Sequence, residues 1–139
     1  MKPDGAIACA VAILACQFAL ACPAIAQDVA EGQRLFGRCA ACHAVGDRAR
    51  HRTGPQLNGV VGRVVGSAEG FRYSKAFVRL KDEGQVWTEA MLDEYLARPA
   101  EAIRGTRMTF AGLSKAQDRA NVIAYLKSLQ PTQIVRGAE

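Results

Sequence analysis

Apolar residues recur at helical spacing in a segment that begins near residue 28. Asp28-x-x-Glu31 places an oxygen-bearing side chain and a glutamate where they can satisfy the first free amides of a helix. The apolar stripe passes through Leu35 and Phe36 and reaches a pair of cysteines. The pattern therefore predicts a first helix that runs up to this pair.

Two further helices are predicted in the middle of the chain. Ser74 can cap a short helix through Leu80, which Gly84 ends. Thr88 can cap a longer helix, which Pro99 stops. The apolar face of this longer helix consists of Leu92, Tyr95 and Leu96.

The clearest helical pattern lies near the C-terminal end of the chain. Ser114-x-x-Gln117 has the form of a capping box, and Pro131 can terminate the helix. The predicted buried face consists of Val122, Ile123, Tyr125, Leu126 and Leu129.

Two segments lack a regular period. Glycines interrupt residues 45–71 too often for a regular element, and residues 104–113 hold two glycines without a sustained pattern. No segment combines a period of two with bounding turns, so the predicted fold class is all-α: three main helices, short helices and long glycine-rich loops. Because loops longer than about 15 residues are unusual without function or internal support, we expect a bound cofactor to fill the centre.

The first 26 residues differ from the rest. Residues 6–21 are apolar except for one glutamine, follow a short start with a lysine, and lead to small residues that end at Ala26. We interpret residues 1–26 as a secretory signal peptide that is cleaved after Ala26, with an uncleaved membrane anchor as the alternative. The remainder divides into one domain over residues 27–130 and a tail over residues 131–139.

The number and positions of the cysteines add to this picture. The chain has 139 residues, half of them hydrophobic, which is the size of one domain and excludes a collagen-like or low-complexity chain. Three of the five cysteines lie in the predicted signal peptide, which leaves 5 − 3 = 2, Cys39 and Cys42. The net charge of +5 is unchanged by cleavage, because the signal peptide holds one lysine and one aspartate. The product is expected in an oxidising, extracytoplasmic compartment.

The candidate chemistry lies in Cys39-Ala40-Ala41-Cys42-His43, which has the C-x-x-C-H spacing of a c-type haem attachment site. Two thiols one helical turn apart can form thioethers to two vinyl groups, while the adjacent imidazole faces the iron of the same ring. Three other interpretations of the motif are less favoured. A thioredoxin-like redox pair would need a βαβ setting, and a disulfide would leave His43 unexplained. A zinc site that includes His51 would need the adjacent residues Cys42 and His43 to converge on one ion.

A methionine is the expected sixth ligand, since a thioether opposite histidine favours electron transfer at a raised potential. Two methionines follow the signal peptide. Met91 lies on a predicted helix, where a core role is expected, whereas Met108 lies in an irregular stretch. We therefore favour Met108, because functional side chains concentrate on loops.

The chain resembles class I cytochrome c from residue 32 to residue 126. Beyond the cysteine motif, the likeness rests on Thr53-Gly54-Pro55-Gln56-Leu57-Asn58-Gly59, Gly70-Phe71-Arg72-Tyr73-Ser74, residues 87–99, Gly105-Thr106-Arg107-Met108-Thr109-Phe110 and Ile123-Ala124-Tyr125-Leu126. The resemblance implies a small all-α fold wrapped round one covalent haem c, with His43 and Met108 as the axial ligands of its iron.

The resemblance also implies roles for other side chains. The Pro55 carbonyl would accept a hydrogen bond from His43, Tyr95 would approach the methionine sulfur, and Phe110 would cover the haem edge. Arg63, Tyr73, Trp87 and Thr106 would neighbour the haem propionates. Gly32, Phe36, Val122 and Tyr125 would form the contact between the first and last helices. Phe77 and Arg104 depart from the family pattern, which has Asn and Pro there, and His51 is expected to be a hydrogen-bonded loop residue.

The function implied is that of a monomeric periplasmic electron carrier and not an enzyme. Exposed cations would surround the haem edge and steer the carrier to acidic surfaces of a cytochrome bc-type donor and of an oxidase, reaction centre or reductase acceptor. They are Arg38, Arg52, Arg107 and Lys115. Scattered basic residues on an exported chain do not support nucleic-acid binding. The alternatives are a membrane-anchored subunit of a respiratory complex and a haem peroxidase or ligand sensor in which Met108 detaches.

Overall fold

The fold consists of helices joined by long loops, as the periodicity predicts. The computed structural model describes residues 26–130, so most of the predicted signal peptide, Pro131 and the predicted tail lie outside the described residues. The helices are α1 (Val29–Phe36), α2 (Lys75–Asp82), α3 (Glu89–Ala97), α4 (Pro99–Ala102) and α5 (Ala116–Ser128). Within residues 26–130 there is no strand, only an isolated antiparallel bridge between Val64 and Val86. The all-α prediction is confirmed.

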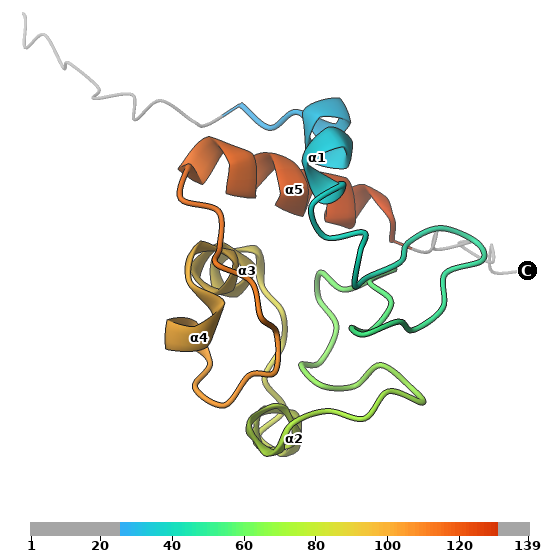
Figure 1. Ribbon diagram of the computed structural model, residues 1–139, viewed down its shortest axis with the longest axis vertical. Coiled ribbons are helices and arrows are strands. Elements are labelled where there is room, and N and C mark those ends of the chain that lie inside the picture. Colours follow the sequence, from blue (N-terminus) through green and yellow to red (C-terminus); the bar gives the residue numbers. More distant parts are fainter. Residues whose placement is uncertain (1–25, 131–139) are drawn as a thin grey trace, which may run out of the picture.

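The crossing of α1 over α5 is the central helix–helix contact (Figure 1). Gly32 allows it, because a Cβ at this position would lie 2.0 Å from the Asn121 carbonyl oxygen. On the same side, the rings of Phe36 and Tyr125 lie 5.6 Å apart between centroids. Val122 is 1% exposed. These are the four residues expected at this contact.

The helix starts agree with the sequence for α1, α2 and α3 and differ for α5. Asp28 caps α1 by accepting a hydrogen bond from the Glu31 amide, and Thr88 caps α3 in the same way. Ser74 precedes α2, but its side chain makes no capping bond. The predicted capping box at Ser114 is wrong: α5 begins at Ala116, and the side-chain Nε2 of Gln117 donates to Asn121 Oδ1 instead.

The chain turns sharply after α3, but Pro99 does more than stop the helix. Arg98 has φ −152° and ψ 81°, which breaks α3, and Pro99 then opens the single turn of α4. Proline is favoured at a first helical position because its missing N–H has no partner there. This break sends the chain from α3 into the irregular segment before α5.

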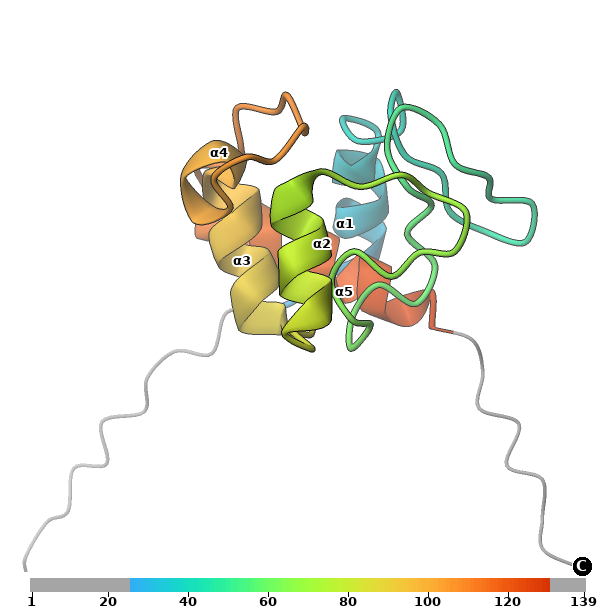
Figure 2. The same cartoon turned by 90° about the horizontal axis from the view of Figure 1, so that it is seen from below.

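Two long loops occupy one end of the molecule. In Figure 2 the loop after α1 and the loop between α4 and α5 rise at the same end, on opposite sides of α2. The second loop is closed at its base, where the Leu113 amide donates to the Leu96 carbonyl at 2.8 Å. Gly112 permits this closure, because its φ is +102° and a Cβ there would lie 2.0 Å from the Ala97 carbonyl oxygen. None of the helices described is long and apolar enough to cross a membrane.

Candidate functional site

The cysteine motif continues the helical turn beyond α1. The Cys39 amide donates to Phe36 O at 2.8 Å, and the His43 amide donates to Cys39 O at 2.9 Å. This turn presents two free thiols in different surroundings: Cys39 is half-buried against the core, and Cys42 is exposed. Burial raises the pKa of the Cys39 thiol. Both cysteines are thus at least partly exposed and free for covalent attachment.

His43 is fixed from both sides of its ring. Its Nδ1 lies 2.7 Å from the Pro55 carbonyl oxygen, so the hydrogen bond expected between these residues is present. Gly54 packs on the same ring, since a Cβ there would lie 2.3 Å from Cε1. Burial lowers the pKa of His43, opposed by the bond to Pro55. A carbonyl only accepts, so Nδ1 carries the proton and Nε2 keeps its lone pair, which is the form that binds a metal.

Met108 lies in the loop between α4 and α5, half-buried against the core. Its amide donates to Thr106 Oγ1 at 3.2 Å, and the same oxygen lies 2.8 Å from the Tyr95 hydroxyl. Burial raises the pKa of Tyr95, opposed by the bond to Thr106. The hydrogen bond recorded for the Tyr95 hydroxyl is with Thr106, and the expected approach of Tyr95 to the methionine sulfur stays a prediction. Tyr95 thereby holds the loop that presents Met108.

Arg63, Tyr73 and Trp87 lie near one another. The Arg63 guanidinium donates to Asn58 O at 3.1 Å and to Gln56 O at 3.3 Å, and burial lowers its pKa. Burial likewise raises the pKa of Tyr73, and the positive charge of Arg63 opposes this rise. Trp87 is 6% exposed and joined to Arg63 by a backbone hydrogen bond. The Tyr73 hydroxyl accepts from the Ala68 amide at 3.3 Å. A half-buried cation and a half-buried hydroxyl are therefore available for carboxylates of a ligand.

Phe77 occupies the middle of an aromatic cluster. Its ring stacks on Tyr73 with a centroid distance of 5.7 Å, and it lies 6.1 Å from Trp87 and 6.0 Å from Tyr95. Trp87 and Tyr95 are 5.1 Å apart. Phe77, which stands where the family pattern has a polar residue, thus joins these aromatic rings into one continuous cluster.

The residues present fit a covalently bound haem c. The donor set comprises two thiols one turn apart, a neutral imidazole with a free Nε2 and a thioether, which is the chemistry that haem iron and vinyl groups require. Several apolar side chains pack against the core yet stay partly exposed: Leu57, Val61, Phe77, Met108 and Phe110. Ser74 Oγ is buried without a hydrogen-bond partner among residues 26–130. A large apolar group with polar edges would cover these surfaces.

The remaining predicted residues are placed as follows. His51 is a hydrogen-bonded loop residue, as expected: Nε2 lies 2.7 Å from Glu69 O, and Nδ1 accepts from the Gln56 amide at 3.1 Å. No group of three metal-ligating side chains occurs within the described range, so the zinc interpretation gains no support. Met91 packs against the core, and Arg104 is exposed.

The expected cations are all exposed. Arg52 lies against the cysteine turn, where its Nη1 donates to Ala40 O at 2.5 Å. Arg107 donates from its guanidinium to the Arg72 carbonyl. Guanidinium groups thus flank both the motif that holds the cysteines and the loop that holds Met108.

Two contributors to the site were given no role from the sequence. Asn58 closes the loop that carries Pro55, because its side chain bonds both the amide and the carbonyl of Gly46 at 2.8 Å. Gly54 provides the flat surface against the His43 ring. The resemblance predicted the contact of Pro55 with His43, but no periodic signal could have indicated that Gly54 also packs on this ring.

Comparison with known proteins gives consistent matches. The family model described as "Cytochrome c" matches residues 29–130. The chain is 46% identical over 99 residues to cytochrome c2 of Agrobacterium tumefaciens (strain II Chrys), and the alignment covers 71% of this chain and 89% of that protein. It is also 46% identical over 99 residues to cytochrome c-550 of Ancylobacter novellus, and this alignment covers 71% of the chain and 92% of that protein.

Solved structures agree with the sequence matches. The structure of cytochrome c2 from Rhodospirillum centenum superposes with a TM-score of 0.71 at 36% identity, covering 75% of this chain and 99% of that chain. Cytochrome cH from Methylobacterium extorquens superposes with a TM-score of 0.65 at 39% identity, covering 73% and 98%.

Proposed function

Because the chain belongs to the cytochrome c family, we propose that it is a periplasmic carrier of single electrons with His43 and Met108 as the axial ligands of its haem iron. Its class is that of the monohaem class I cytochromes c, which bind haem c covalently and act as electron carriers and not as enzymes. The haem, when bound, supplies an iron that alternates between the ferrous and ferric states.

The observation that carries the proposal is the fixed orientation of His43. The Pro55 carbonyl holds Nδ1 at 2.7 Å, and Gly54 leaves room for the ring to lie flat against the loop. Such a partner fixes the tautomer of a ligating histidine and raises its basicity. Cys39 and Cys42 would hold the porphyrin covalently on the adjacent turn. The imidazole then needs no rearrangement when the iron changes charge.

The loop between α4 and α5 would supply the sixth ligand through Met108. The hydrogen bonds from the Met108 amide and the Tyr95 hydroxyl to Thr106 define the position of this loop. A thioether opposite histidine raises the reduction potential. Phe110, half-buried on the same loop, would shield the haem edge from water.

The propionates of the haem would face polar side chains. Arg63, Tyr73, Trp87 and Thr106 are the candidates, and the side chains of Arg63 and Tyr73 are both half-buried. Buried carboxylates without such partners would be costly. These side chains would therefore keep the propionates ionised without exposing the ring.

Electron transfer requires encounter with other redox proteins. We assign the contact surface to the exposed cations Arg38, Arg52, Arg107 and Lys115, which lie on the two segments that flank the site. They would attract acidic surfaces on a cytochrome bc-type donor and on an oxidase, reaction centre or reductase acceptor. The carrier would act as a monomer, exported and cleaved after Ala26. A membrane-anchored subunit is the alternative for a chain that keeps residues 1–26.

The test is a pyridine haemochrome spectrum combined with the intact mass of the exported protein. We expect one haem per chain, retained after denaturation because two thioethers hold it. A chain without covalent haem would overturn the proposal. Carbon monoxide added to the reduced protein at neutral pH should bind slowly or not at all, whereas rapid binding would favour a ligand sensor or peroxidase.

A further inference from the structure

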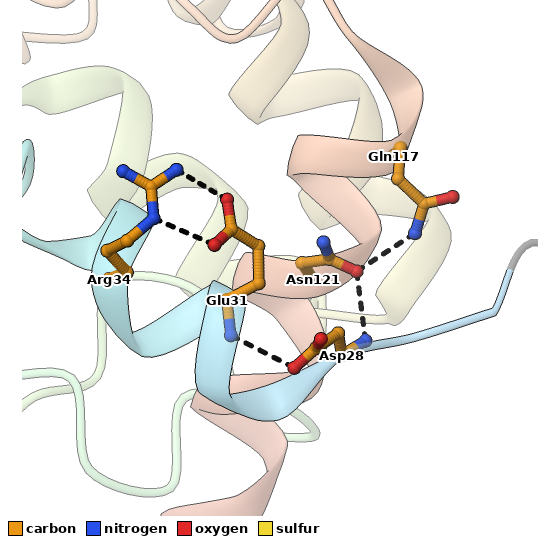
Figure 3. Close-up of polar contacts among 5 residues, drawn as sticks. All are labelled: Asp28, Glu31, Arg34, Gln117 and Asn121. Carbon is orange, nitrogen blue, oxygen red and sulfur yellow. Dashed lines mark hydrogen bonds and ion pairs between the residues drawn. The ribbon is translucent and has the colours of Figure 1, made fainter.

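The first turns of α5 hold an arginine that reaches α3. Asn121 of α5 is turned toward α1, because its side chain accepts from the Asp28 amide and from the Gln117 side chain (Figure 3). Arg119 instead pairs with Asp93 of α3. Its Nε donates to Asp93 Oδ1 at 2.7 Å, and its Nη2 donates to Asp93 Oδ2 at 3.2 Å. This two-point contact fixes the plane of the guanidinium group.

The same guanidinium holds the end of the loop that carries Met108. Its Nη1 donates to the Leu113 carbonyl at 2.9 Å and to the Ser114 carbonyl at 3.0 Å. The Leu113 amide donates to the Leu96 carbonyl at the end of α3. Leu113 is 2% exposed, and both of its backbone polar groups are therefore fixed to α3. The amide is bonded to α3 directly, and the carbonyl is linked to it through Arg119.

We propose that Asp93 and Arg119 are positioning residues for Met108, an inference that rests on the proposed ligation of the iron by this methionine. The pair acts through the backbone of Leu113 and Ser114, which follow Met108 in the same loop. It fixes the place where the loop returns to the helices. The thioether is thereby held in its position against ligands from solution.

A second ion pair between the same helices differs in what it contacts. Lys127 of α5 donates to Glu89 of α3 at 2.5 Å. The Lys127 side chain is 55% exposed, whereas that of Arg119 is 12% exposed. Exposed ion pairs contribute little to stability, but a largely buried guanidinium that loses its carboxylate is left with an unpaired charge. Without Asp93, we therefore expect Arg119 to turn toward solvent and release the two loop carbonyls.

The experiment compares Arg119→Gln and Asp93→Asn with the control Lys127→Gln in the ferric holoprotein, with imidazole as the competing ligand. Imidazole binds the iron only when the methionine has left it, so its affinity measures how firmly Met108 is held. We expect imidazole to bind about tenfold to a hundredfold more tightly to the first two variants, because hydrogen bonds of a charged group are lost. Lys127→Gln should bind imidazole as the native protein does.

The two loop variants also control for each other. Arg119→Gln removes a positive charge and Asp93→Asn removes a negative charge, so a change in the same direction excludes an effect of net charge. Asp93→Asn keeps the size of the side chain and remains informative if Arg119→Gln does not fold. Arg119→Lys keeps the charge without the planar fork and should give an intermediate affinity.

Hydrogen exchange gives a readout that does not depend on the iron. The Leu113 amide should exchange faster in Arg119→Gln and Asp93→Asn than in the native holoprotein. The Leu92 amide, which donates to the Thr88 carbonyl within α3 at 2.9 Å, should exchange at the native rate. A general loss of stability would instead accelerate the exchange of both amides.

Three results would contradict the proposal. Native imidazole affinity in both loop variants refutes the positioning role. An equal rise in Lys127→Gln assigns the effect to the link between α3 and α5 and refutes it as well. If Met108→Ala leaves the imidazole affinity unchanged, the methionine is not the ligand, and the proposed function fails in that respect independently of Arg119.

Discussion

The α1–α5 crossing and the two long loops are stabilised in different ways. At the crossing, backbone approaches backbone at Gly32, and apolar side chains such as Val122 are almost completely buried. In the loops, Val65 and Leu113 are buried, but Leu57, Val61 and Phe110 remain partly exposed, and hydrogen bonds from Asn58 and Thr106 help to define the backbone. The crossing is complete as protein alone, whereas the loop region is a shell that needs a central group.

The largest expected effect is the loss of that group. In Cys39→Ala/Cys42→Ala the haem has no covalent attachment, and the half-buried loop residues lose the surface that would cover them. We expect the broad, non-cooperative thermal transition of a chain without a filled core, measured by circular dichroism. The double variant Cys9→Ala/Cys16→Ala, altered only in the predicted signal peptide, should yield the normal mature protein. A sharp transition in the first variant would show that the loops are self-supporting.

The next effect separates the two methionines. Met108→Ala should keep the haem through Cys39 and Cys42 but lose the sixth ligand. Its reduction potential should fall by a sizeable part of the roughly 0.8 V range that axial ligands span. Carbon monoxide should then bind rapidly to the reduced form. Met91→Ala should leave both properties unchanged and lower the stability by about 2–3 kcal/mol. Equal potentials for the two variants would exclude Met108 as the ligand.

The third prediction tests the crossing itself. Gly32→Ala places a Cβ 2.0 Å from the Asn121 carbonyl, which forces the helices apart. We expect a loss of about 3 kcal/mol in the free energy of unfolding of the holoprotein, measured by denaturant titration. Gly37→Ala is the control, because its backbone is helical with φ −48°. Its effect should stay within about 1 kcal/mol. A similar loss in both variants would contradict a close approach specific to Gly32.

The smallest effect concerns pH at the start of α1. The hydrogen bond from Arg34 lowers the pKa of Glu31 below its ordinary value of 4.5. A carboxyl group with a depressed folded pKa contributes stability above its unfolded pKa, and this contribution is lost as the pH falls through the folded pKa. The stability difference between the native chain and Glu31→Gln should therefore be small at neutral pH and shrink below about pH 4. A difference that grows on acidification would contradict this assignment.

The sequence predicted the helices and the chemistry better than the contacts between them. Periodicity and caps placed α1, α3 and α5, and the spacing of Cys39, Cys42 and His43 indicated the chemistry. The N-terminal boundary of α5 was wrong because the Gln117 side chain donates to Asn121 in the next turn of α5 and to the distant Ala26 carbonyl, and so does not form the local capping box. The pairing of Tyr95 with Thr106 and the packing of Gly54 on His43 join residues distant in sequence, where no periodic pattern can indicate proximity.

The closed base of the loop between α4 and α5 has a consequence for dynamics. The Leu113 amide meets the Leu96 carbonyl at 2.8 Å, so the segment that carries Met108 leaves the helical scaffold and returns to it at nearly one point. A loop with such a narrow neck can open as a separate cooperative unit, at lower free energy than global unfolding. Ligand exchange at the iron would then be a local fluctuation of this loop, while α3 and α5 stay folded.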